Sequence, residues 1–442
     1  MKTNEVVITD LTHEGYGVGK VDGYPLFIPG AMVGEIVKYE VEKMNKSYGT
    51  AKLIEIVKPS PHRVKPRCNI FGVCGGCDLM HMSYQQQLAF KVKMAEDSFR
   101  KLGHLNLSVD EIIGMDEPYY YRNKVQIPFG MRKNKVICGY YKKKSHEIAS
   151  FDYCYIQPEY ITELITFIRN LANEYKISAY DEKEHQGVLR HVLVRNNYLH
   201  EMMIVFITNT DNIPNINEII NKIIKRYPQV KSIIHNINNK KTNVILGDKY
   251  HVLYGNDYLI DKIHDLQFKI SFYSFFQVNL TQTEKLYQRV LNYLKPASND
   301  IIIDGYCGVG TITLMIAKYC KQIYGIEVVN EAIENAKENA KLNNINNATF
   351  IVGKVEDEIG NLINNKITAI VLDPPRKGVE KVVIEKIIEN NIHKIVYVSC
   401  NVATLARDLS LLASDYDIKN VTLVDMFCHT ADVEAVALLE RK

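Results

Sequence analysis

The 442-residue sequence lacks any long apolar run, and no hydrophobic stretch approaches the roughly 18 residues that a membrane-spanning helix needs. Its first residues, MKTNEVVITD, also lack the apolar segment of a signal peptide. These absences exclude the integral membrane and secreted classes. We therefore expect a cytoplasmic protein that does not act at a membrane.

The sequence also has little excess of positive over negative charge and no repeated segments. The formal net charge is only +3, and there are no internal repeats. With 46% hydrophobic and 24% charged residues, the composition is that of an ordinary globular protein, long enough for two or three domains. Nine cysteines in a reducing compartment favour metal binding or catalysis over disulfides.

Basic residues do gather in one segment, residues 119–146, which contains no acid. Eight lysines and arginines, among them Lys142, Lys143 and Lys144, interleave there with five tyrosines. Basic groups neutralise phosphates and aromatic rings stack on unpaired bases, so the mixture suits RNA. A solvated lysine-rich hairpin is the alternative interpretation.

The chain divides into three patterns. Residues 1–59 alternate short β-prone runs with glycines, which predicts a small β-barrel. Residues 118–262 mix strands with two amphipathic helices and predict an α+β domain of unassigned topology. From Asp300 onward, strands and helices alternate regularly, which predicts an α/β domain with a doubly wound, largely parallel sheet. The expected strands there are 301–303, 323–326, 349–352, 369–372 and 394–398, with helices 311–320, 330–342, 379–389 and 403–412 and two further β-like runs, 421–426 and 433–439.

Several of these expected strands end in residues that carry chemistry. The first is followed by the glycine turn Asp304–Gly310, and the second by Glu327. A glycine turn with an acid at the next strand end favours a nucleoside cofactor, because such a carboxylate commonly accepts hydrogen bonds from ribose. Two later strands end at Asp373 and just before Cys400, and ligands bind at this edge of an α/β sheet.

Cys400 predicts methyl transfer to a pyrimidine carbon. Asp373 begins the motif Asp-Pro-Pro-Arg, whereas methyltransferases that act on exocyclic amines carry an aromatic residue in place of Arg376. C5 of uracil is not nucleophilic, but addition of a thiolate to C6 makes it so. A base must then remove the C5 proton. Glu434 is our candidate, with His429 and Asp432 as alternatives.

A second group of cysteines predicts a metal centre. Cys68, Cys74 and Cys77 are interleaved with glycines, which let a short loop bring thiolates together. Cys154 or Cys138 could supply the fourth ligand. Iron–sulfur and zinc both accept four thiolates, and the spacing fits either.

Together, these motifs resemble the TRAM-domain RNA uracil-5-methyltransferases, which make 5-methyluridine in 23S rRNA or tRNA. The resemblance implies a TRAM barrel at 1–59, a central domain at 60–84 and 118–262, and an S-adenosylmethionine-dependent methyltransferase domain at 85–117 and 263–442. It implies RNA as the partner, with 23S rRNA favoured over tRNA and no obligate protein partner.

The resemblance also assigns roles to single residues. It implies Cys400 as the nucleophile and Glu434 as the base. It implies contacts to the methyl donor from Gln277 (in Phe275–Asn279), Tyr306, Glu327 and Asp373, and a [4Fe–4S] cluster on Cys68, Cys74, Cys77 and Cys154, with zinc as the alternative. This sequence departs from the family pattern in having Cys428 in place of proline, Asp432 in place of histidine, and Lys354 where a polar or acidic residue is usual.

Two other functions compete with this one. A cytosine-5 RNA methyltransferase fits the Asp-Pro-Pro-Arg context and the thiolate group poorly. A non-catalytic RNA-binding protein or chaperone would need neither Cys400 nor Glu434.

Overall fold

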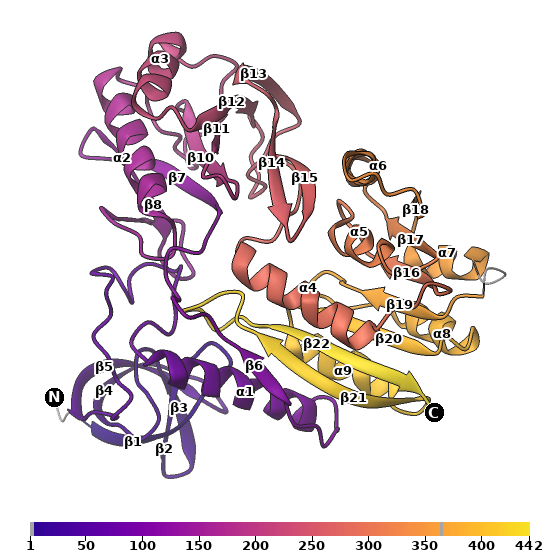
Figure 1. Ribbon diagram of the computed structural model, residues 1–442. Coiled ribbons are helices and arrows are strands. Elements are labelled where there is room, and N and C mark those ends of the chain that lie inside the picture. The colour runs from indigo at the N-terminus through magenta and orange to yellow at the C-terminus, as the bar shows by residue number, and fades with distance from the viewer. Residues whose placement is uncertain (1–3, 363–365) are drawn as a thin grey trace.

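The computed structural model describes residues 4–362 and 366–442, which form a barrel, a central domain and a larger α/β domain (Figure 1). No helix in these ranges combines the length and the apolar character needed to cross a bilayer.

The N-terminal residues form a closed barrel with strand order β1-β2-β3-β5-β4. Its strands are β1 (Asn4–Leu11), β2 (Gly17–Val21), β3 (Tyr24–Ile28), β4 (Ile36–Met44) and β5 (Gly49–Lys58). Alternate side chains such as Ile8, Ile28 and Val37 point inward and are buried. Buried Glu35 accepts the Nε–H of Arg63 at 2.5 Å, which ties the barrel to the chain that follows.

The central domain is a mixed sheet with strand order β13-β12-β11-β10-β7-β8-β9. Its strands are β7 (Lys124–Arg132), β8 (Lys135–Tyr141), β9 (Ile148–Ser150), β10 (Leu189–Asn196), β11 (Met202–Thr208), β12 (Val230–Ile237) and β13 (Lys249–Gly255). Helices α2 (Glu159–Glu174) and α3 (Ile216–Arg226) bury isoleucines such as Ile165 and Ile223 against it.

The third sheet has the order β18-β17-β16-β19-β20-β22-β21-β6. Its strands are β6 (Glu111–Ile113), β16 (Ile301–Gly305), β17 (Gln322–Glu327), β18 (Ala348–Val352), β19 (Ala369–Leu372), β20 (Lys394–Ser399), β21 (Tyr416–Val424) and β22 (Glu434–Arg441). Strands β16 to β20 are parallel, and β22 runs antiparallel to both of its neighbours. A hairpin of β14 (Tyr258–Ile263) and β15 (Leu266–Ser271) precedes this sheet in the chain.

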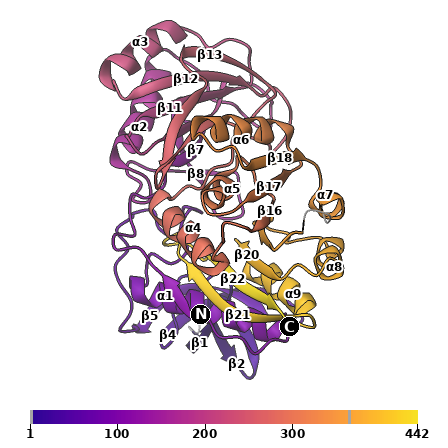
Figure 2. The same cartoon turned by 45° about the vertical axis from the view of Figure 1, so that its right-hand side comes forward.

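Helices cover both faces of this sheet, as Figure 2 shows. One face carries α4 (Leu280–Leu294), α5 (Thr311–Ala317) and α6 (Asn330–Leu342). The other carries α1 (Tyr84–Lys101), α7 (Val355–Leu362), α8 (Lys381–Glu389) and α9 (Val402–Leu412). The predicted fold class, a doubly wound α/β domain with an N-terminal barrel, is confirmed.

Two elements of this domain come from the first quarter of the chain. Helix α1 packs against α9, and β6 extends the sheet beside β21. The sheet is therefore completed by residues that precede the central domain in sequence.

Candidate active site

The parallel register of β17, β16 and β19 aligns the ends of these strands. Glu327, Tyr306 and Asp373, which lie at or just after those ends, are therefore neighbours along one edge. The amide of Gly308 donates to Glu327 Oε2 at 3.3 Å, which closes the glycine turn onto the next strand. Tyr306 has φ of +67°, a strained conformation for a residue other than glycine and one that is frequent at functional sites.

Two carboxyl groups lie at this edge, Asp304 fully buried and Asp373 half-buried. Burial raises the pKa of Asp304 to about 7 and that of Asp373 to about 7. Asp304 Oδ2 accepts the Thr313 hydroxyl at 2.5 Å, while Oδ1 has no partner among the described residues. Asp304 was not among the predicted site residues, although it begins the glycine turn. Buried acids of this kind favour a ligand that carries positive charge.

Cys400 and Glu434 lie beside each other where β20 ends and β22 begins. The last pair of the antiparallel ladder is Ser399 of β20 with Ala435 of β22; Cys400 directly follows the first of these residues and Glu434 directly precedes the second. Burial, and then the charges of Glu434 and Asp373, raise the pKa of Cys400 to about 11. Burial, followed by the charges of Asp373 and Asp432, raises the pKa of Glu434 to about 8. Glu434 Oε2 has no hydrogen-bond partner within the described ranges.

Asn401 fixes the backbone that follows Cys400. Its side chain accepts the amides of Ala403 at 3.0 Å and Thr404 at 3.3 Å, which caps α9. The amide of Asn401 donates to Ser399 Oγ at 3.2 Å. The sequence interpretation omitted Asn401, although an asparagine directly before a helical pattern is a recognised N-cap signal.

A cavity of about 680 Å³ opens onto Cys400. Arg376 and Asp432, which form an ion pair at 3.2 Å, line it on the α/β side. Tyr16 of the barrel and Lys143 line the other side of this cavity. Glu434 is 3% exposed and is not one of the residues that line this cavity.

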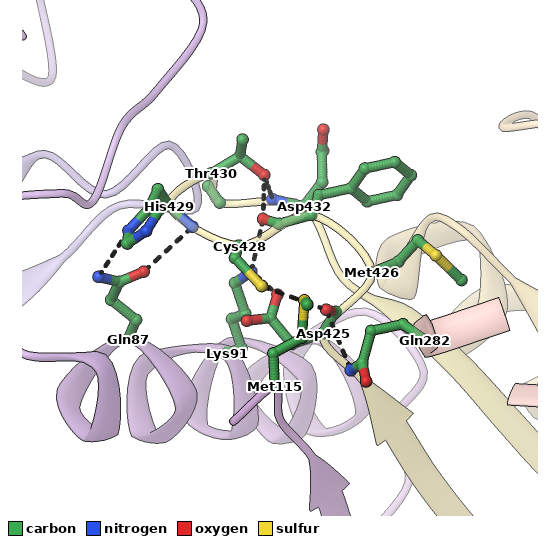
Figure 3. A network of polar contacts seen from close by, with 12 residues as sticks. Gln87, Lys91, Met115, Gln282, Asp425, Met426, Cys428, His429, Thr430 and Asp432 are labelled. Carbon is green, nitrogen blue, oxygen red and sulfur yellow. Dashed lines mark hydrogen bonds and ion pairs between the residues drawn. The ribbon is translucent and has the colours of Figure 1, made fainter. Parts of the chain in front are cut away.

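Of the two alternative bases, Asp432 lines the cavity and His429 does not. His429 is 2% exposed, and its ring lies 4.5 Å from that of Tyr119. Gln87 Oε1 accepts its amide at 3.1 Å, and Gln87 Nε2 lies 3.2 Å from its Nδ1 (Figure 3). Burial lowers the pKa of His429 to about 4. His429 therefore holds the loop in place and does not face the cavity.

Gln277 lies in the loop between β15 and α4 and is buried. Asn123 Nδ2 donates to its carbonyl at 3.1 Å, which ties this loop to the start of the central sheet. Two residues on, Asn279 caps α4 by accepting the amide of Gln282 at 3.3 Å, and it donates to Met426 O at 3.1 Å. The predicted block Phe275–Asn279 thus joins the central domain to the α/β domain.

Cys68, Cys74, Cys77 and Cys154 line one small cavity of about 30 Å³. Cys138 lies elsewhere, buried in the apolar core of the central domain. Burial raises the pKa of the Cys74 and Cys77 thiols, and the other cysteines of the cavity add to both shifts. Within residues 4–362 and 366–442, no three His, Cys, Asp or Glu side chains are arranged to hold a metal ion.

The three consecutive lysines of the basic segment each approach a carboxylate. Lys142 pairs with Glu147 at 2.5 Å, Lys143 with Asp78 at 2.5 Å, and Lys144 lies 3.9 Å from Glu14. Lys143 and Lys144 also line the cavity at Cys400. Part of the basic segment therefore faces the candidate active site.

Two protein-family models match the chain, one over the N-terminal barrel and one over the residues that follow it. A family model described as tRNA (uracil-5-)-methyltransferase matches residues 84–442, and a TRAM domain model matches residues 2–54. An uncharacterized RNA methyltransferase of Oceanobacillus iheyensis is 48% identical over 98% of this chain and 95% of its own length. One from Clostridium tetani is 44% identical over 99% of this chain and 96% of its own length. The crystal structure of Pyrococcus abyssi tRNA (uracil-54, C5)-methyltransferase in complex with S-adenosyl-L-homocysteine is similar at a TM-score of 0.80. It is 28% identical and covers 99% of this chain and 100% of its own.

Proposed function

The chain belongs to the tRNA (uracil-5-)-methyltransferase family of S-adenosylmethionine-dependent RNA methyltransferases, and on that premise we propose that it methylates C5 of a uridine through a covalent bond between Cys400 and C6. The observation that carries this proposal is the register of β20 with β22, which brings Cys400 and Glu434 together directly beyond the pair Ser399 and Ala435, at the ligand-binding edge of the sheet.

In the proposed reaction, the Cys400 thiolate adds to C6 of the uracil ring, and the ring becomes an enolate that is nucleophilic at C5. After C5 has gained the methyl group, Glu434 takes the C5 proton. The electron pair of the C5–H bond then restores the C5–C6 double bond and expels the thiolate. A carboxylate with a pKa of about 8 suits proton removal near neutral pH.

S-adenosylmethionine supplies the methyl group from a positively charged sulfonium. We propose that Gln277, Tyr306, Glu327 and Asp373 hold it. The alignment of Tyr306, Glu327 and Asp373 along one edge and the raised pKa of half-buried Asp373 support this assignment. A positive charge bound there would favour the ionised forms of Asp373, Glu434 and Cys400 alike.

RNA with 5-fluorouridine at the target position tests the nucleophile. The parent protein with methyl donor should form an adduct that survives a denaturing gel, because fluorine cannot leave as a proton does. Cys400→Ala should bind RNA but form neither adduct nor product, and full activity in this variant would refute the mechanism.

We further propose that Cys68, Cys74, Cys77 and Cys154 hold a [4Fe–4S] cluster. Four thiols around one buried cavity fit this group, and the position of Cys138 removes it as a ligand. Zinc, which also accepts four thiolates, is the alternative occupant of the same site.

Two RNA substrates fit this chemistry. The sequence favours 23S rRNA through its resemblance, whereas the similar solved structure from Pyrococcus abyssi is that of a tRNA methyltransferase. Mass mapping of 5-methyluridine in both RNAs, from cells with and without this protein, distinguishes the two.

A further inference from the structure

The loop between β21 and β22, residues 425–433, ends directly at Glu434. It contains no helix or strand, and His429 within it has φ of +68°, in the left-handed region. Its conformation therefore depends on contacts with other parts of the chain. Glu434 itself is paired with Val424 of β21, and the contacts that hold the loop act together with this pairing to set where its side chain lies.

Helix α1 supplies one set of these contacts (Figure 3). Lys91 Nζ lies 2.5 Å from Asp425 Oδ1 and donates to Phe427 O at 3.1 Å. One turn earlier, Gln87 binds the amide and the ring of His429. The start and the middle of the loop are thus fixed to one helix.

The cysteine-bearing segment, residues 67–81, supplies a second set. The amides of Asp78 and Leu79 both donate to His429 O, at 2.8 and 2.9 Å. Asp78 Oδ2 accepts the amide of Ala431 at 3.4 Å. Asp78 directly follows Cys77. One of the four cavity cysteines is therefore adjacent in sequence to a residue that binds the loop.

This segment has little structure of its own. Gly75 and Gly76 precede Cys77, and the described residues 67–81 contain no helix and no strand longer than an isolated bridge. Lys143 pairs with Asp78, and Leu79 packs against Met32, Met82 and Phe90. The four thiols around one cavity are a further support, directly before Asp78 in the chain.

We propose that the cysteine-bearing segment is a positioning element for Glu434, with Asp78 as its contact residue. Loss of the thiol site then slows removal of the C5 proton, while RNA binding and thiolate attack continue. This inference rests on the proposed function, because it concerns the base of that reaction. Small misplacements of a catalytic group are costly, and a shift of about 1 Å can lower a rate 100-fold.

Cys154→Ser tests the inference from the far side of the thiol cavity, since Cys154 lies outside both the segment and the loop. In this variant a methylated protein–RNA adduct should accumulate with ordinary uridine RNA and donor, and RNA affinity should match that of the parent. Hydrogen–deuterium exchange should be about 30-fold faster at the amides of Asp78, Leu79 and Ala431, which donate the bonds between segment and loop. This change is equivalent to losing two ordinary hydrogen bonds.

Cys138→Ser is the matched control, because it changes a buried cysteine of the same domain that lies outside the cavity. It should behave like the parent in both measurements. If Cys154→Ser exchanges and turns over like the parent, the positioning role is refuted.

Asp78→Ala keeps all four thiols and serves if Cys154→Ser does not fold. It should retain bound iron, exchange faster at residues 425–433, and accumulate the adduct. Asp152→Ala, which removes an exposed acid two residues from Cys154, should change none of these.

The 5-fluorouridine assay on the parent protein distinguishes a failure of this inference from a failure of the proposed function. If the parent forms no 5-fluorouridine adduct, the proposed function is refuted. If it does, and Asp78→Ala is indistinguishable from the parent, only the positioning role is refuted.

Discussion

Replacing Lys91 with methionine should strongly destabilise the α/β domain. The Lys91 and Asp425 side chains are both fully buried, and their charged atoms lie 2.5 Å apart. Methionine keeps the apolar stem but leaves the Asp425 carboxylate with the Tyr84 hydroxyl, at 2.8 Å, as its remaining side-chain donor. Removing one partner of a buried ion pair costs about 3–5 kcal/mol, because the other charge stays buried and uncompensated.

For a domain of about 150–250 residues, each kcal/mol lowers Tm by about 2–4 °C, so the expected loss is about 6–20 °C. Calorimetry on the full chain would measure it. Lys93→Met is the matched control on the same helix, because Lys93 is 58% exposed and pairs with Asp10 and Asp97 at the surface. This control should cost less than about 1 kcal/mol, or about 4 °C.

The double variant Lys91→Met/Asp425→Asn should recover part of the loss, since the neutral amide removes the unpaired charge. If Lys91→Met melts within the range of the Lys93 control, the pair contributes no more than a surface contact. The reasoning from its burial would then be wrong.

Four further predictions concern Glu434, the cysteine cavity and the basic segment. Glu434→Gln should accumulate a methylated adduct with ordinary RNA on a denaturing gel, and turnover equal to the parent's would assign the base elsewhere. Burial raises the pKa of Glu434 from 4.5 to about 8, so its contribution to folding is complete below pH 4.5 and is lost as the pH rises through 8. In denaturant titrations, Glu434→Gln should therefore be more stable than the parent above pH 8 and equal to it below pH 4.5. Anaerobically purified protein should be brown with about four iron and four sulfide per chain, and Cys154→Ser but not Cys138→Ser should lose the colour. Colourless protein with one zinc would contradict the cluster. Replacing Lys142, Lys143 and Lys144 together with alanine should weaken RNA binding without changing donor affinity. It should also flatten the salt dependence of RNA binding, by about 0.7–0.9 log units for each phosphate that is no longer neutralised. An unchanged salt slope would mean that these lysines serve only their carboxylate partners.

Much of the α/β domain could be predicted because its signals are local. The expected helix 330–342 coincides with α6, and the expected strand 394–398 falls one residue short of β20. Once the strands are parallel, their carboxyl ends must share an edge. That Tyr306, Glu327 and Asp373 share this edge then follows from the sequence, whereas their proximity depends on the strand order β17-β16-β19, which has no local signal.

Other features have no local signal. Strand β6 is three residues long, too short for a period, and its partner β21 lies near the far end of the chain. The choice between Cys138 and Cys154 depends on how the central domain folds. The contact of residues 78–79 with His429 uses backbone amides, which every sequence offers equally. Gln277 was found through family resemblance, and its role, like that of the other site residues, remains a prediction.

The position of β22 has a consequence for synthesis of the protein. This strand is made after all the others in its sheet, yet it lies between β20 and β21. A nascent chain that has emerged only as far as β21 therefore holds Cys400 at an unfinished sheet edge, with unpaired backbone groups that invite contact with other chains. Because Glu434 is the first residue of β22, the proposed base is synthesised together with the strand that pairs with this edge. On the proposed mechanism, a chain truncated before β22 would still present its nucleophile but could not release methylated RNA.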